Sequence, residues 1–216
     1  MDFTFHKEVS IPIGTAMLKG DLILPMKSNA IVVFSHGSGS SRLSSRNQMV
    51  AKYLNEKHFG TLLFDLLTEE EDKYYHNRFD IDLLTKRLAG ATEWLERHPA
   101  AKDCRIGYFG ASTGAASALK AAAYLPRIQA VVSRGGRPDL AMEQLSNVEA
   151  PTLLIVGGLD FEVLEMNKEA YLKLRCEKKL EVVAGATHLF EEAGKMEIVS
   201  ELAGDWFEKY LTVVKA

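Results

Sequence analysis

Residues 106–116, IGYFGASTGAA, decide the fold of this chain. An apolar run typical of a β-strand leads into a G-x-S-x-G pentapeptide, and a run of small residues typical of a helix follows. The pattern predicts a tight strand-to-helix turn with Ser112 at its apex, where Gly110 and Gly114 leave room for strand and helix to approach. A serine held there projects its hydroxyl beside the free N–H groups of a helix start, which suits a nucleophile.

Apolar runs alternate with amphipathic segments along the rest of the chain. Two early runs, at residues 3–11 and 16–24, predict an antiparallel pair at a sheet edge. Continuous apolar runs typical of strands buried on both faces follow at residues 30–34, 61–64, 105–109, 130–132, 153–156 and 180–183. Helical spacing occurs between them, at residues 49–54, 81–95, 117–125, 164–174 and 198–211. The alternation predicts an α/β fold, a three-layer sandwich with helices on both faces of a mostly parallel sheet of about eight strands.

Length and composition limit the possible functions. A chain of 216 residues with 47% hydrophobic and 25% charged residues is typical of one soluble domain. A net charge of -3 gives no reason to expect nucleic acid or an anionic membrane as a partner. The two cysteines, Cys104 and Cys176, lie far apart and suggest neither a disulfide scaffold nor a metal site. With no membrane span or signal peptide in the pattern, we expect a cytoplasmic protein.

The loop that follows the run at residues 30–34 reads SHGSGSS. Its glycines and serines suit an anion-binding backbone, but the Gly-Lys-Ser/Thr ending of a phosphate-binding P-loop is absent. The His-Gly-x-Gly pattern matches the oxyanion loop of serine hydrolases instead. We therefore predict that the amides of Ser38 and Thr113 form an oxyanion hole, and that His36 is a structural histidine of the loop.

Two further polar residues follow strand-like runs, where ligands bind in open parallel sheets. Asp160 comes after residues 153–156, and His188 lies in a small-residue loop after residues 180–183. Asp160 alone is also consistent with a helix N-cap, and His188 alone with an ordinary loop histidine. Together with Ser112 they follow the chain order serine, acid, histidine of one class of hydrolases. We predict a catalytic triad of Ser112, Asp160 and His188.

These motifs resemble those of α/β-hydrolases, and the chain is most similar to the dienelactone hydrolase family. The resemblance covers nearly the whole chain and extends to residues 64–67, FDLL, and 133–139, SRGGRPD, which are similar to a subgroup with a serine nucleophile. Some members of that subgroup are fused to phosphoribosyltransferase-like domains. We expect residues 1–216 to form a single α/β-hydrolase domain. About eighteen residues separate the sixth and seventh strands, so no separate lid domain is expected.

The resemblance implies hydrolysis of a small ester, thioester or lactone without a cofactor or metal. The name-giving enzymes of the family have a cysteine where this chain has Ser112, so the resemblance leaves turnover of dienelactone itself open. Arg134 and Arg137 follow the sixth strand, and we hypothesise that one of them binds a carboxylate or phosphate of the substrate. The alternative is a salt bridge to an acid such as Asp139.

The acidic run at residues 68–72, TEEED, is predicted to be a solvated loop. The same fold also serves as a non-catalytic binding or interaction module, because fold does not determine function.

Overall fold

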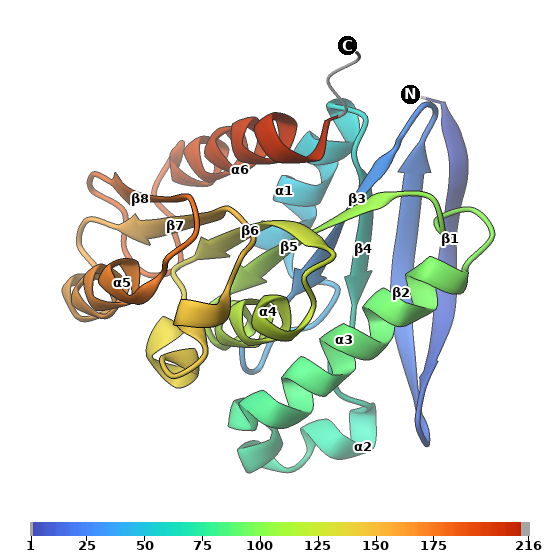
Figure 1. Ribbon diagram of the computed structural model, residues 1–216, viewed down its shortest axis with the longest axis horizontal. Helices are drawn as coiled ribbons and strands as arrows, with labels where there is room; N and C mark the ends of the chain where they lie inside the picture. Colours follow the sequence, from blue (N-terminus) through green and yellow to red (C-terminus); the bar gives the residue numbers. More distant parts are fainter. Residues whose placement is uncertain (1, 213–216) are drawn as a thin grey trace.

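One twisted sheet runs through the molecule (Figure 1). The computed structural model describes residues 2–212, and within them the strand order is β1-β2-β4-β3-β5-β6-β7-β8. The pairs β1–β2 and β2–β4 are antiparallel, and the other pairs are parallel. The strands are β1 (Phe3–Ile13), β2 (Ala16–Pro25), β3 (Ala30–Ser35), β4 (Gly60–Phe64), β5 (Arg105–Ala111), β6 (Ile128–Arg134), β7 (Thr152–Gly157) and β8 (Lys178–Val183).

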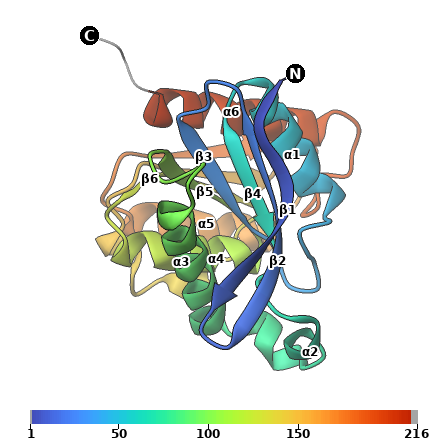
Figure 2. The same ribbon diagram turned by 90° about the vertical axis from the view of Figure 1, so that its right-hand side faces the viewer.

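Helices cover both faces of the sheet, as the sequence predicts. In Figure 1 the helices α1 and α6 lie on one side of it, and α3, α4 and α5 lie on the other. Turned by 90°, Figure 2 shows the long β1–β2 hairpin at the sheet edge, with α2 beyond one end of it. The helices are α1 (Ser45–Glu56), α2 (Glu69–Asp72), α3 (Ile81–Arg97), α4 (Thr113–Tyr124), α5 (Phe161–Lys173) and α6 (Lys195–Leu211).

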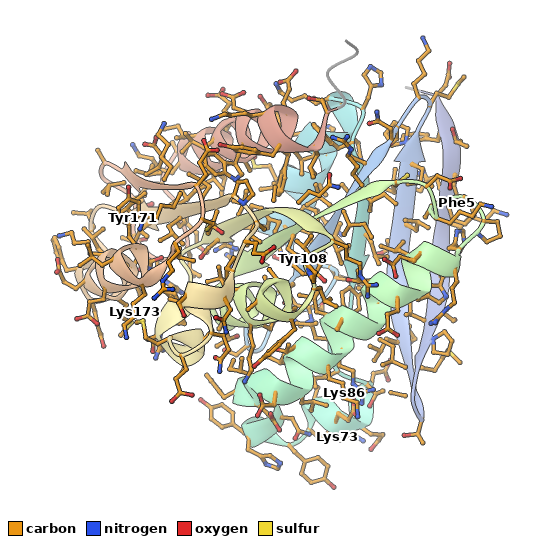
Figure 3. The ribbon with its side chains drawn as sticks, viewed as in Figure 1. Phe5, Lys73, Lys86, Tyr108, Tyr171 and Lys173 are labelled. Atoms are coloured by element: carbon orange, nitrogen blue, oxygen red, sulfur yellow. The ribbon has the colours of Figure 1, made fainter. Side chains whose placement is uncertain are left out.

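The apolar core is split by the sheet into two clusters, one under each helical layer. Alternate residues of a strand face opposite clusters: in β6, Val131 packs toward α3 and α4, whereas Val132 packs toward α1 and α6. Tyr108 of β5 is fully buried, and its hydroxyl shares a 2.6 Å hydrogen bond with Thr92 Oγ1. Figure 3 shows Tyr108 in the interior, whereas Lys86 and Lys173 lie at the periphery.

The prediction of a solvated loop at residues 68–72 is wrong. Thr68 Oγ1 accepts a hydrogen bond from the Glu71 amide at 3.2 Å, and Glu71 Oε2 accepts one from the Thr68 amide at 2.9 Å. This reciprocal capping box begins the short helix α2. Glu71 also forms an ion pair with the buried side chain of Arg87. The acidic run thus anchors α2 to α3 instead of serving solvation alone.

The parallel strands place their carboxyl ends at one edge of the sheet. Across that edge Ser35 of β3 pairs with Gly110 of β5, and Arg134 of β6 pairs with both Ala111 of β5 and Ile155 of β7. Between β6 and β7 the described chain forms two short 3-10 turns, η2 (Pro138–Ala141) and η3 (Leu145–Asn147), and no separate lid domain. The loops that carry the predicted site residues therefore meet at one edge of the sheet.

Candidate active site

Ser112 stands at the apex of the turn between β5 and α4. Its backbone has φ of 51° and ψ of -122°, a conformation that is strained for a residue with a side chain. The Ser112 amide donates to the Arg134 carbonyl at 3.2 Å, and the Ser112 carbonyl accepts from the amides of Ala115 and Arg137 at 3.0 and 3.1 Å. These bonds hold the strained turn in place from β6 and from the start of α4.

The backbone of α4 approaches the backbones of β3 and β5 closely at the two glycines of the pentapeptide. A Cβ on Gly110 would lie 2.4 Å from the Ala115 Cα, and a Cβ on Gly114 would lie 2.1 Å from the Ser35 carbonyl oxygen. Both distances are far shorter than a carbon contact allows. The G-x-S-x-G pattern is therefore required here by the close approach of α4 to β3 and β5.

Asp160 and His188 form a direct pair. His188 Nδ1 lies 2.7 Å from Asp160 Oδ2, and the carboxylate is the more buried partner, with 14% of its side chain exposed against 36% for the histidine. Asp160 precedes α5, but its side chain makes no capping hydrogen bond to that helix. The carboxylate thus orients the imidazole, which leaves the Nε2 atom as the free side of the ring.

The loops that carry this pair are hydrogen-bonded to each other. The Gly158 amide donates to the Val183 carbonyl and the Leu159 amide donates to the Ala186 carbonyl, both at 2.9 Å. Gly157 permits the approach, because a Cβ there would lie 2.5 Å from the Ala186 carbonyl oxygen. The loop after β7, which carries Asp160, and the loop after β8, which carries His188, are therefore held together.

Ser112 and His188 both lie near the carboxyl end of β6. Within residues 2–212, no hydrogen bond joins their side chains. The Ser112 amide bonds to Arg134, and Gly135, the next residue, packs against His188. Hydrogen bonds to a nucleophile are often long in a ligand-free site and tighten with substrate. The serine and the histidine–aspartate pair therefore flank the carboxyl end of β6.

The two amides predicted for the oxyanion hole lie beside each other, and one of them is already engaged. A Cβ on Gly37 would lie 3.1 Å from Ser112 Cβ, so the loop after β3 packs against the serine. The Ser38 amide donates to Thr113 Oγ1 at 2.9 Å. Thr113 is the first residue of α4, so its own amide has no partner within the helix. A substrate oxygen at the Ser38 amide would have to displace the threonine hydroxyl.

The neutral ring of His36 joins the loop after β3 to the loop after β4. Its Nε2 accepts from the Leu66 amide at 3.1 Å, which leaves Nδ1 to donate to the Gly37 carbonyl at 3.0 Å. Burial holds the pKa of His36 below its ordinary value. The ring therefore has a structural role, as the sequence predicts.

Arg134, the last residue of β6, and Arg137, which follows the strand, differ in their partners. Arg137 makes a two-pronged salt bridge to Asp139, with distances of 2.9 and 2.8 Å, and Asp139 raises the pKa of Arg137. Arg134 is 4% exposed, and the one side-chain hydrogen bond that it makes within residues 2–212 is long, 3.4 Å from Nη2 to Asn47 Oδ1. The salt-bridge alternative thus describes Arg137, whereas Arg134 has no acidic partner within the described chain.

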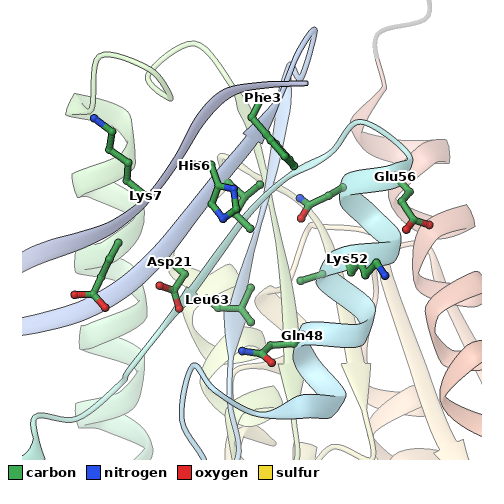
Figure 4. Close-up of a pocket in the computed structure, with 12 residues that line it drawn as sticks. Phe3, His6, Lys7, Asp21, Gln48, Lys52, Glu56 and Leu63 are labelled. Carbon is green, nitrogen blue, oxygen red and sulfur yellow. The ribbon is translucent and has the colours of Figure 1, made fainter. Parts of the chain in front are cut away.

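Two cavities of the described chain are lined by none of the residues predicted for the triad. One of about 450 Å³ opens between α1 and the β1–β2 hairpin (Figure 4), lined by Phe3, His6 and Asp21 of the hairpin and by Gln48 and Lys52 of α1. Neither this cavity nor one of about 480 Å³ near Arg42 is lined by a triad residue. Within residues 2–212, no cluster of histidine, cysteine and acidic side chains is arranged to hold a metal ion. No described helix is both long enough and apolar enough to cross a bilayer.

The sheet, the strained serine turn and the histidine–aspartate pair define the α/β-hydrolase class of fold. The model of the dienelactone hydrolase family matches residues 19–216, and the chain belongs to that family. A crystal structure of a dienelactone hydrolase from Anabaena variabilis is 51% identical in sequence and superposes with a TM-score of 0.94, covering 96% of this chain and 99% of that one.

More distant structures share the fold. Est1E from Butyrivibrio proteoclasticus is 16% identical with a TM-score of 0.79, over 94% of this chain and 98% of that chain. A Pyrococcus furiosus esterase is 19% identical with a TM-score of 0.78, over 96% of this chain and 92% of that chain. These distant structures show that the chain shares their fold.

The curated relatives are longer proteins. Two from Mycobacterium tuberculosis, both with the name "Putative phosphoribosyl transferase", are 54% identical over 207 residues, which is 95% of this chain and 46% of theirs. The chain thus spans about half the length of the curated relatives that it matches. That name is the name of those longer proteins.

Proposed function

We propose that this protein is a serine hydrolase that cleaves a small ester, thioester or lactone through an acyl-enzyme on Ser112. The observation that carries the proposal is the 2.7 Å contact between His188 Nδ1 and Asp160 Oδ2, at the sheet edge where Ser112 stands in its strained turn. A carboxylate on Nδ1 selects the tautomer whose Nε2 accepts a proton and stabilises the imidazolium that results.

The first half of the reaction forms the acyl-enzyme. Ser112 Oγ attacks the carbonyl carbon of the substrate while its proton passes to His188 Nε2. The Thr113 amide, joined by the Ser38 amide once Thr113 Oγ1 has turned away, donates to the oxyanion that develops. When the intermediate collapses, the bond to the leaving oxygen or sulfur breaks and Nε2 returns the proton to it.

The second half releases the acid. Water attacks the acyl carbon while His188 Nε2 takes one of its protons, and the Ser112 Oγ–acyl bond then breaks. Nε2 gives the proton back to Ser112 Oγ, so the enzyme is regenerated and the product is a carboxylic acid. Asp160 stays ionised throughout and holds the ring.

Replacing the nucleophile tests this proposal. Ser112→Ala should abolish hydrolysis of p-nitrophenyl acetate, because no other group in the scheme forms the acyl-enzyme, and far-UV circular dichroism should show an unchanged fold. Hydrolysis at the wild-type rate by this variant would overturn the proposal. An inert wild-type protein that fails with esters, thioesters and lactones would favour the alternative of a non-catalytic binding module.

A further inference from the structure

The peptide group between Gly37 and Ser38 is held in a fixed orientation. Its carbonyl oxygen, on Gly37, accepts from His36 Nδ1 at 3.0 Å and from the Ser40 amide at 3.2 Å. The N–H of a trans peptide points away from the C=O of the same peptide. The Ser38 amide therefore points to the opposite side, where Thr113 Oγ1 accepts it at 2.9 Å. The amide keeps this direction through bonds in which the threonine takes no part.

The hydroxyl of Thr113 makes a single hydrogen bond. The bond from the Ser38 amide is the only one that Thr113 Oγ1 makes within residues 2–212, although the residue is only 2% exposed. A hydroxyl can both accept and donate, so the hydrogen of this buried group is left without an acceptor in the described chain. Threonine in a helix commonly occupies two χ1 rotamers. A turn about that one torsion would release the Ser38 amide without moving the backbone.

Two buried hydroxyls between β3 and α4 show what a structural role looks like in this chain. Ser35 Oγ lies 2.7 Å from Ser117 Oγ, and Ser117 Oγ donates to the Gly114 carbonyl at 2.9 Å. Both serines are fully buried, and each hydroxyl hydrogen has an acceptor, because Ser35 donates to Ser117. This pair joins the strand to the helix, so the link between the two elements does not require the hydroxyl of Thr113.

The contact between Ser38 and Thr113 lies directly beside the reacting serine. Thr113 is the next residue after Ser112, and a Cβ on Gly37 would lie 3.1 Å from Ser112 Cβ. In the proposed reaction the Ser38 amide donates to the oxygen of the substrate. An oxygen atom of the chain itself thus takes the hydrogen bond that the substrate oxygen needs.

The hydroxyl competes with every ligand of this amide. A hydroxyl and an ester carbonyl are both neutral acceptors, whereas hydrogen bonds to an oxyanion or a carboxylate are roughly twice as strong. The ester, the tetrahedral intermediate and the product acid must all break the same bond between Ser38 and Thr113 to reach the amide. A cost that is equal for bound substrate and transition state weakens binding and leaves the chemical step unchanged.

We infer that the Thr113 hydroxyl is a built-in occupant of the oxyanion hole, which fills the hole between turnovers and weakens the binding of ester and product acid alike. This role rests on the proposed function, because it concerns the same oxyanion hole. The hydroxyl acts through the Ser38 amide, so Thr113 is a positioning residue in this respect. Its return to the amide displaces the product carboxylate, which would otherwise accept from the amides of both Ser38 and Thr113.

Single-turnover kinetics tests the competition. With the enzyme in excess over p-nitrophenyl acetate, the release of p-nitrophenolate gives the dissociation constant Ks of the ester and the acylation rate constant k2 separately. Thr113→Val replaces the hydroxyl by a methyl group in a side chain of similar shape. Ks should fall about threefold to tenfold, which corresponds to one neutral hydrogen bond, and k2/Ks should rise by the same factor. A lower k2 at unchanged Ks would overturn the inference, because the hydroxyl would then assist the reaction.

Matched variants separate competition from a structural role. Thr113→Ser keeps a hydroxyl at this position and should keep Ks close to the wild-type value. Thr113→Ala removes the hydroxyl without adding a methyl group and provides a second variant if valine does not fit. Ser117→Ala removes the structural hydroxyl between β3 and α4, so its Tm should fall while its Ks stays that of the wild type. Equal decreases of Ks in Thr113→Val and Ser117→Ala would overturn the inference.

Product inhibition provides a second measurement. Acetate, the product of the same ester, should inhibit Thr113→Val at a concentration about threefold to tenfold lower than it inhibits the wild-type protein, for the same reason. If the wild-type protein releases no p-nitrophenolate, the proposed function is wrong and the role of Thr113 fails with it. If the wild-type protein is acylated, but Ks and acetate inhibition are the same in Thr113→Val, the built-in occupant is wrong and the hydrolase stands.

Discussion

Gly135 lies against the imidazole of His188: a Cβ on Gly135 would stand 3.5 Å from both Cε1 and Nδ1 of that ring and 3.2 Å from the His188 carbonyl oxygen. The φ of Gly135 is 51°, a value that favours glycine. The residue after β6 therefore packs against the ring that Asp160 orients. The position of the histidine depends on a residue with no functional group of its own.

Gly135→Ala should lower both stability and kcat. The positive φ and the tight contact should reduce the free energy of unfolding by about 1–2 kcal/mol, and a displaced ring should slow proton transfer from Ser112. Thermal unfolding and ester hydrolysis measure the two effects. Gly14→Ala is the control, because Gly14 has φ of 60° but nothing within 4 Å of its Cβ position, so only stability should fall. Equal kcat values in the two variants would contradict the supporting role of Gly135.

Asp160→Asn should lower kcat by roughly 10⁴-fold, the size of effect known when the amide selects the wrong histidine tautomer. Stability should change little, because Asp160 makes no capping bond to α5. Steady-state kinetics and Tm check the two statements together. The loss of a helix cap costs about 1 kcal/mol of stability. If Asp160→Asn lost that much stability and kept its activity, Asp160 would be a helix cap only.

His36 should make the protein acid-sensitive. Its pKa in the folded state is held below the ordinary value by burial, so between those two values the unfolded chain binds more protons than the folded one. Stability is therefore complete above the ordinary histidine pKa of about 6.5 and falls as the pH drops below it. Tm measured from pH 7.5 to 5 should fall less steeply in His36→Gln than in the wild type. The control is His76→Gln at an exposed position, and a His36→Gln slope equal to that of this control would refute the prediction.

The fold and the order of the site residues could be predicted from the sequence for a physical reason. Strands buried on both faces leave continuous apolar runs, and parallel strands bring the residues that follow them to one edge. The helix α2 could also have been predicted, because Thr68 and Glu71 have the spacing of a capping box. Helix α4 begins at Thr113, directly after the serine, whereas the Ala-rich pattern indicated only residues 117–125.

Other features of the site depend on contacts that no local pattern encodes. The bond from the Ser38 amide to Thr113 Oγ1 joins residues 75 apart in sequence and depends on one side-chain rotamer. The difference between Arg134 and Arg137 likewise follows from what packs around each: Asp139 lies two residues from Arg137, but the surroundings of Arg134 come from α1 and the His188 loop. The sequence pointed to both arginines, but its spacing could not show that only Arg137 has an acidic partner.

Labelling with a fluorophosphonate probe, followed by mass spectrometry of the peptides, tests whether Ser112 is an activated nucleophile. The probe forms a stable bond only with a serine that a neighbouring base activates. We predict one phosphonylated site, Ser112, with labelling strongly reduced in His188→Ala and absent in Ser112→Ala. An unlabelled wild-type protein, or a label on a different serine, would contradict it.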